Sequence, residues 1–154
     1  MALEGLPTSL ALEIVTPDSV LVTEKVDEVV VPAAEGYLGV LPGHTPLLAT
    51  LAIGELWYRK GNQKFYLAIA GGFVEVLPDK VTILAQIAER AEDIDVARAQ
   101  RARQRAEERL ARPGSEVDVA RAQASLLRAA VRLQVAALAA AGRGVPLSAP
   151  SMPV

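Results

Sequence analysis

The first 88 residues alternate between short apolar runs and turn-forming residues. The runs are rich in valine, isoleucine, leucine and aromatic residues, which favour strands. They are Ser19–Val31, Leu47–Ile53, Leu56–Lys60, Lys64–Ala70, Phe73–Leu77 and Lys80–Ala85. Glycine or proline lies between the runs, as at Gly61-Asn62 and Pro78-Asp79, and no gap suits a crossover helix. The pattern therefore predicts an antiparallel β-sandwich or flattened barrel.

After residue 88 the apolar positions recur at helical spacing. Asp95 is a suitable cap for a helix over about 95–112, which Pro113-Gly114 would end. Ser115 with Asp118 forms a pair similar to a capping box, which begins a second helix over 116–141. Two helices joined by so few residues fold back on each other. We therefore expect an α+β chain, with a β-sandwich domain over 1–88, a helical hairpin over 89–142 and a mobile tail over 143–154.

Small residues dominate the apolar faces of the predicted hairpin. The first helix presents Ala99, Ala102, Ala106 and Leu110. The second presents Val117, Ala120, Ala124, Leu127, Val131, Val135 and Leu138. Alanine favours helix formation but buries roughly 2 kcal/mol less than leucine at each position. Such helices suit either a conformational switch, which exchanges packing partners, or a close-packed structural hairpin.

Composition excludes several classes of protein. With 51% hydrophobic and 22% charged residues the chain is not disordered. It has no cysteine, which excludes disulfides, thiolate metal sites and cysteine nucleophiles, and its single histidine, His44, cannot form a histidine cluster. We expect no apolar run of the ~20 residues that a membrane span requires. The first residues lack the basic start of a signal peptide, so we expect a soluble intracellular protein.

The sequence also lacks the common catalytic and phosphate-binding motifs, such as the P-loop and the zinc-protease helix. His44 lies in the double-proline turn Leu41–Pro46, where it is interpreted as a hydrogen-bonded loop residue rather than a catalytic one. No active site is therefore expected, and the chain is not predicted to be an enzyme.

Arginines form the strongest charge pattern. One stripe follows the first helix at helical spacing and consists of Arg98, Arg101, Arg105, Arg109 and Arg112. The second helix carries Arg121, Arg128 and Arg132, the last two a single turn apart. The stripe is either a solvated face, a contact for nucleic-acid phosphates, or a contact for an acidic protein surface. Two arginines one turn apart can also hold a phosphate chain. No aromatic residue lies among the arginines, which argues against single-stranded nucleic acid.

Four segments together resemble one family, the epsilon subunits of F-type ATP synthases. The segments are Glu35–Leu48 (EGYLGVLPGHTPLL), Gly71–Val76 (GGFVEV), Val81–Ala85 (VTILA) and Ile94–Ala99 (IDVARA). They occur in the family's order, and the resemblance extends from about Leu10 to Leu138.

The resemblance implies a ten-stranded sandwich, a two-helix hairpin and a non-catalytic role in the central stalk. The implied partners are the gamma subunit, the ring of c subunits and the alpha/beta catalytic hexamer, at the cytoplasmic face of the cell membrane and without membrane insertion. In this family the hairpin lies folded on the sandwich or extends into the hexamer, where it inhibits ATP hydrolysis. No cofactor is required, and ATP is a possible regulatory ligand.

Three sets of residues match functional positions of the family. The c-ring contact would consist of Glu35, Gly36, Tyr37, Pro42, Gly43 and His44, although many members have an acidic residue where Tyr37 stands. The ATP site would consist of Glu89, Ile94, Asp95, Arg98, Ala99, Arg128 and Arg132. The inhibitory contact with the beta subunits would consist of Arg105, Arg109 and Arg112. The alternative function is an arginine-rich adaptor that binds polyanions or nucleic acid.

Overall fold

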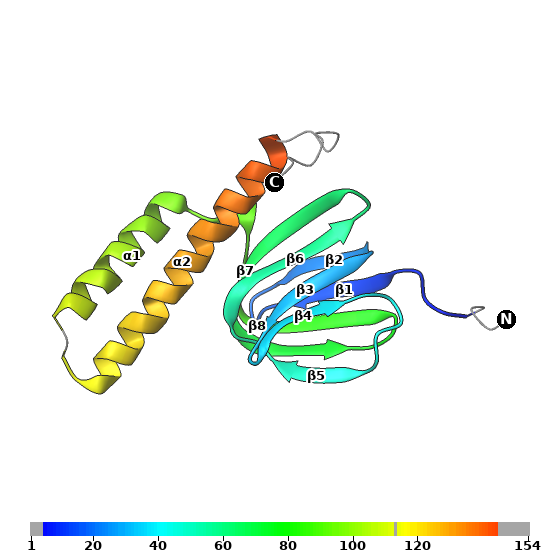
Figure 1. The fold of residues 1–154 in the computed structure, drawn as a ribbon, viewed down its shortest axis with the longest axis horizontal. Coiled ribbons are helices and arrows are strands. Elements are labelled where there is room, and N and C mark those ends of the chain that lie inside the picture. The colour runs from blue at the N-terminus through cyan, green and yellow to red at the C-terminus, as the bar shows by residue number, and fades with distance from the viewer. Residues whose placement is uncertain (1–4, 113, 145–154) are drawn as a thin grey trace, which may run out of the picture.

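The computed structural model describes residues 5–112 and 114–144. In these residues, eight strands precede a short 3-10 helix and two α-helices (Figure 1). The strands are β1 Leu10–Val15, β2 Val20–Val26, β3 Glu28–Ala33, β4 Gly36–Val40, β5 Leu47–Thr50, β6 Ile53–Lys60, β7 Gln63–Val76 and β8 Lys80–Arg90. The helices are η1 Ala91–Asp93, α1 Val96–Ala111 and α2 Glu116–Gly144. Of the tail predicted to be mobile, residues 145–154 lie outside the described residues.

The strands form one folded sheet in the order β2-β1-β8-β7-β6-β3-β4, with β5 paired to β7. The two long strands belong to both layers of the sandwich. Residues 63–70 of β7 pair with β6, whereas residues 73–76 pair with β5. Likewise β8 pairs with β1 through residues 80–84 and continues along β7 to Arg90. If each half of β7 and β8 is counted separately, the eight strands give the expected ten segments.

One pair of strands departs from the antiparallel expectation. β1 and β8 run parallel, with Leu12 opposite Val81 and Ile14 opposite Ile83. Parallel neighbours need a long connection, and here six intervening strands provide it. Inward-facing residues of both layers, such as Leu12, Leu56 and Ile83, are fully buried and form an apolar core. Tyr58 also lies in this core, where burial and then the nearby carboxylate of Glu24 raise its pKa to about 12.

A pair of glycines lies at the point where β7 passes from one layer to the other. Gly71 and Gly72 have φ angles of +75° and +117°, which side chains disfavour. A Cβ atom at Gly72 would lie 2.0 Å from the carbonyl oxygen of Leu84. The glycines therefore allow β7 to turn while it stays in register with β8.

Substituting Gly72→Ala is expected to destabilise the protein by about 3 kcal/mol or more, because backbone strain and a backbone clash add together. Gly61→Ala is the matched control. Gly61 also has a positive φ, +59°, but nothing lies within 4 Å of its Cβ position, so the expected loss is only about 1 kcal/mol. Urea unfolding curves measure both values, and equal losses would contradict the role of Gly72.

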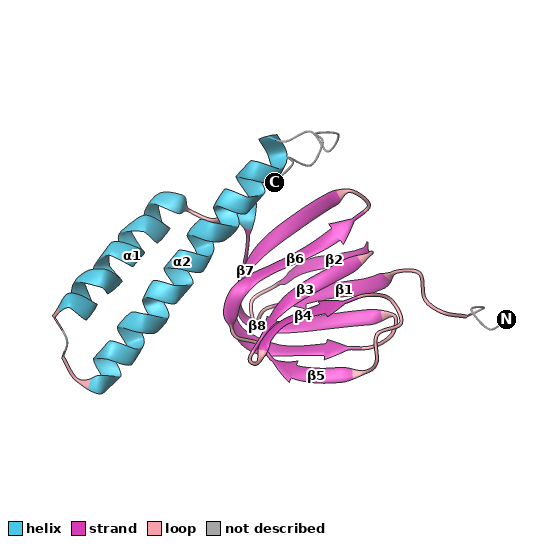
Figure 2. Ribbon diagram, in the orientation of Figure 1, coloured by secondary structure: helices cyan, strands magenta, loops and turns pink. Residues whose placement is uncertain are grey.

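The two helices form an antiparallel hairpin on one side of the sandwich (Figure 2). α2 packs against β6, β7 and η1, whereas α1 packs along α2. By length and composition alone, the Glu116–Gly142 part of α2 passes as a possible membrane span, because an 18-residue window within it has a mean hydropathy of 1.4. This corrects the expectation that no such run exists, because a helix of mostly alanine and leucine tolerates two arginines without becoming polar. In this structure those arginines, Arg128 and Arg132, face the sheet.

Candidate functional site

Small side chains join α2 to the sandwich. The buried members of this contact are Ala68, Ala91, Ile94, Val131 and Val135, and Ile53, Tyr66, Ala136 and Ala139 pack around them. Four of these nine residues are alanines, each of which contributes only one methyl group to the contact. The hairpin therefore docks through a modest apolar contact.

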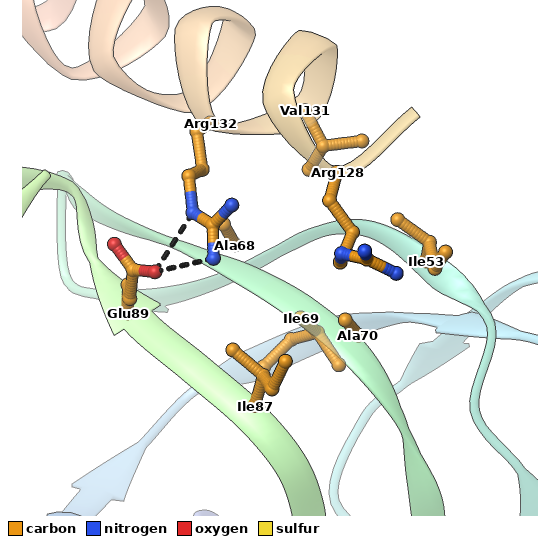
Figure 3. A pocket seen from close by; sticks show the side chains of 9 residues that line it. All are labelled: Ile53, Ala68, Ile69, Ala70, Ile87, Glu89, Arg128, Val131 and Arg132. Atoms are coloured by element: carbon orange, nitrogen blue, oxygen red, sulfur yellow. Dashed lines mark hydrogen bonds and ion pairs between the residues drawn. The ribbon is translucent and has the colours of Figure 1, made fainter. Parts of the chain in front are cut away.

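One ion pair lies at the edge of this apolar contact. Both Nε and Nη2 of Arg132 lie 2.7 Å from the same carboxylate oxygen of Glu89 (Figure 3). Glu89 belongs to β8 and faces the helix because it lies directly opposite Ala68, which belongs to the buried contact. The Arg132 and Glu89 side chains are 26% and 32% exposed. The pair therefore joins the hairpin to the sandwich in a partly desolvated position.

A small cavity lies beside this ion pair, between α2 and the sheet. Its volume is about 10 Å³, room for about one water molecule. It is lined by Ile53, Ala68, Ile69, Ala70, Ile87, Glu89, Arg128, Val131 and Arg132. Arg128 reaches toward the sheet beside Ile53 and donates a hydrogen bond of 3.1 Å to the hydroxyl of Ser125 (Figure 3). Two guanidinium groups thus flank one cavity.

The structure gathers three of the seven residues expected to bind ATP around this cavity: Glu89, Arg128 and Arg132. The other four lie just before α1 or in its first turn and do not line the cavity. Ile94 packs in the neighbouring apolar contact, and Ala99 is buried on α1. Asp95 caps α1, where its Oδ1 atom accepts a hydrogen bond of 3.0 Å from the backbone of Arg98. The Arg98 side chain is exposed to solvent.

The arginine stripe of α1 faces solvent. All five stripe residues are exposed, while Ala99 and Ala106 on another face are buried. Within the described part of the chain, none of the five forms an ion pair with a side chain. Arg103, which is outside the stripe, instead pairs with Glu107 at 3.8 Å. The stripe is therefore an exposed cationic surface whose arginines form no ion pair among the described residues, available to an acidic partner.

The residues expected to contact the c ring lie at two ends of β4. Glu35, Gly36 and Tyr37 form the exposed turn before and at the start of the strand. His44 follows its other end, where Nδ1 lies 2.6 Å from the carbonyl oxygen of Thr45. In the same turn Gly43 donates a backbone hydrogen bond of 2.7 Å to Pro78. Both turns are thus present on the surface, but they are separated by the length of a strand.

A groove of about 580 Å³ begins beside the first of these turns. Tyr37 is 61% exposed and lines it, together with residues 33–38 and Leu47–Thr50 of β5. A Cβ atom at Gly54 would lie 2.6 Å from the Cβ of Pro32 and 3.2 Å from the hydroxyl of Tyr37, so a larger residue there would first clash with Pro32 and would also crowd the tyrosine. Tyr37 was expected at this surface from the sequence, whereas Leu47 and Leu48, which are 40% and 69% exposed, were not.

A row of exposed apolar residues crosses the layer that the helices do not cover. Phe73 lies opposite Leu84, Leu84 opposite Val15, and Val15 opposite Val20. Phe73, Leu84 and Val20 are 53%, 54% and 59% exposed. We call Phe73, Leu84, Val15 and Val20 together the apolar row. Sequence reasoning missed it, although consecutive apolar residues at Phe73-Val74 and Ile83-Leu84 place an apolar side chain on each face of a strand.

The described residues contain no group of three or more histidine, cysteine, aspartate or glutamate side chains that could hold a metal ion. The arginine-lined cavity and the groove are two candidate ligand-binding features of the described residues. Together with the apolar row and the arginine stripe, they define two candidate binding sites and two candidate protein-contact surfaces.

Comparison with known proteins gives consistent matches. Residues 9–91 match the model of the ATP synthase delta/epsilon chain β-sandwich domain, and residues 92–137 match that of its long α-helix domain. The ATP synthase epsilon chain of Koribacter versatilis is 57% identical over 102 residues, which is 66% of this chain and 72% of the relative. That of Solibacter usitatus is 53% identical over 108 residues, 70% of this chain and 81% of the relative.

Solved structures agree with the sequence comparisons. A chain in the cryo-EM structure of the Euglena gracilis mitochondrial ATP synthase, containing OSCP, F1 and the c ring, superposes with a TM-score of 0.65. It is 26% identical, and the match covers 89% of this chain and 83% of that one. A chain of the Tetrahymena thermophila central stalk and c ring has the same fold, with a TM-score of 0.60, 15% identity and coverage of 85% and 98%.

Proposed function

Because the chain belongs to the family of ATP synthase epsilon chains and is part of the central stalk, we propose that it is a non-catalytic subunit whose movable hairpin inhibits ATP hydrolysis. The observation that carries this proposal is the small contact between α2 and the sandwich. It consists of nine apolar residues, four of which are alanines, and one partly exposed ion pair. Such a contact is weak enough to open without unfolding either domain.

The apolar row is the surface that we assign to the gamma subunit. Exposed apolar side chains that lie side by side across a sheet mark a protein contact. The row lies on the layer that the hairpin leaves uncovered, so gamma and the folded hairpin do not compete for it. Phe73 and Leu84, at its centre, are the anchors of this contact.

The two turns beside β4 and the groove are the surface that we assign to the c ring. The turn at Gly36 and the turn at Gly43 both contain glycines with positive φ, and prolines at 42 and 46 stiffen the second. A contact that transmits torque benefits from this stiffness. Tyr37 would pack or hydrogen-bond against the ring where many relatives would form an ion pair.

The arginine stripe is the surface that we assign to an acidic segment of the beta subunits, reached when the hairpin extends. Substituting Arg105→Ala, Arg109→Ala and Arg112→Ala together should relieve inhibition of ATP hydrolysis several-fold, with a smaller effect on synthesis. The helix should persist, because alanine is an excellent helix former. Hydrolysis and synthesis rates of the reconstituted complex measure both effects.

The matched control for the stripe is the triple lysine variant, in which all three residues keep their positive charge. We expect it to retain most of the inhibition, since the attraction to an acidic surface is mainly electrostatic. If the alanine variant inhibits as strongly as the unmodified chain, the stripe is only a solvated face. Binding of the chain to DNA or RNA that weakens with salt would favour the adaptor function instead.

We further propose that ATP binds the folded hairpin at the arginine-lined cavity. Arg128 and Arg132 provide paired guanidinium groups for the phosphates. Sites for ligands of this size have volumes of ~300–1,000 Å³, so the present cavity has to open. Ligand that binds only the folded state would shift the hairpin away from its inhibitory position.

The complex as a whole is membrane-associated, and we place this subunit at its cytoplasmic face.

A further inference from the structure

The two arginines at the cavity differ in what they contact. Arg132 places both Nε and Nη2 on one carboxylate oxygen of Glu89, at 2.7 Å each. Arg128 donates to the hydroxyl of Ser125, a neutral group on its own helix. One cation is therefore neutralised by an anion from the sheet, while the other has no ion-pair partner among the described residues.

Glu89 also limits the space in the cavity that a phosphate chain could occupy. Its carboxylate and the guanidinium of Arg132 form one wall of the cavity, which has room for about one water molecule. A phosphate chain that contacted both arginines would lie within a few ångströms of this carboxylate. Two anions that close repel each other strongly in a partly desolvated site. Phosphate and Glu89 are therefore alternative partners of Arg132.

We propose that Glu89 is an internal competitor for the phosphates: its carboxylate holds Arg132 in the ligand-free hairpin, and a nucleotide displaces it instead of binding beside it. This inference rests on the proposed function, in which a nucleotide binds the folded hairpin. It reverses the role expected for Glu89 from the resemblance, where this residue belongs to the ATP-binding set.

The same contact gives the ligand-free hairpin an anchor. Without nucleotide, Arg132 connects α2 to β8 through Glu89. With nucleotide, Arg132 exchanges the carboxylate for a phosphate, and Arg128 gains an ionic partner. The folded hairpin is thus held in both states, and the concentration of nucleotide needed to stabilise it is set partly by the strength of the Glu89 pair.

The test is an ATP titration of the full chain by calorimetry, with Glu89→Gln as the variant. Glutamine keeps the size of the side chain but removes the charge that competes with phosphate. We expect the affinity for ATP to rise about two- to fivefold, the range that one partly exposed ion pair provides. The affinity of the variant for inorganic tripolyphosphate should rise by a similar factor, because Glu89 competes with the phosphates and not with the base.

The matched control is Glu92→Gln, which makes the same change in net charge three residues away. Glu92 is more exposed than Glu89, and its ion pair, at 4.0 Å, is with Arg90 and not with either arginine of the cavity. The affinity of the Glu92→Gln variant for ATP should match that of the unmodified chain. A second control repeats Glu89→Gln in an Arg132→Ala background, where the gain should be clearly smaller, since Glu89 no longer occupies the guanidinium that the phosphate needs.

The outcomes separate this inference from the proposed ATP site. Weaker or unchanged ATP binding by Glu89→Gln overturns the competition but leaves the site intact, with weaker binding identifying Glu89 as a direct ligand. An undiminished gain in the Arg132→Ala background also overturns it. Absence of binding to the unmodified chain and to Glu89→Gln at millimolar ATP rejects the ATP site and the competition together.

Discussion

Substituting Phe73→Asp and Leu84→Asp is expected to lower the affinity for the gamma subunit by about a thousandfold, because each buried anchor of a protein interface contributes about 2 kcal/mol or more. Both side chains are more than half exposed in the isolated chain, so the substitution removes no core packing. The measurement is co-purification and titration with gamma, for which the unmodified chain should form a one-to-one complex.

The control for this variant is Val117→Asp with Leu127→Asp, an equal change in charge and polarity on α2. These two residues are 60% and 48% exposed and lie away from the apolar row. Their replacement should leave gamma binding unchanged. Circular dichroism should show that both double variants remain folded. Unaltered binding by the Phe73/Leu84 variant would place the gamma contact elsewhere.

Substituting Arg128→Ala and Arg132→Ala is expected to weaken ATP binding by at least about a hundredfold. Each hydrogen bond to a charged phosphate is worth roughly 1.5–3 kcal/mol, and the site has no glycine-rich loop to replace them. Calorimetry of the full chain, and the shift of its melting temperature with millimolar ATP, measure the loss. A binding constant that does not change would show that ATP, if it binds, uses other residues.

Two exposed arginines provide the control for the loss of positive charge. Arg101 on α1 and Arg121 on α2 are exposed and do not line the cavity. Replacing both by alanine should reduce ATP affinity only slightly, because their charge is screened by solvent. The Arg132→Ala change also leaves Glu89 without its cation, so we expect the hairpin of the main variant to dock less firmly without ligand.

Local features of this protein could be predicted from the sequence because the interacting residues are close along the chain. Asp95 caps α1 through the backbone of Arg98, and Ser115 accepts a hydrogen bond of 3.3 Å from the backbone of Asp118 at the start of α2. The alanine face predicted for α1 is buried at Ala99 and Ala106. Each of these depends on helical spacing and on the chemistry of one or two side chains.

The extent of individual strands could be predicted less well. The run Lys80–Ala85 continues as β8 to Arg90, which places Glu89 on the sheet and not in a connection. Lys64–Ala70 and Phe73–Leu77 form one strand, β7, because the intervening glycines turn the chain without ending its pairing with β8. A glycine pair in a sequence is typical of a turn, and only the neighbouring strand shows that pairing continues through it.

What the sequence determined by itself was therefore the kind of most elements, though not β1, β4 or η1, together with the N-terminal caps of the two α-helices and the family to which the chain belongs. The tertiary structure decided which elements meet. The apolar row depends on the parallel pairing of β1 with β8, and the cavity depends on where α2 lies on the sheet. Glu89 and Arg132 are 43 residues apart, and no local periodicity connects them. Such contacts arise from the packing of whole elements, where the free energy depends on the combined surfaces and not on any short pattern.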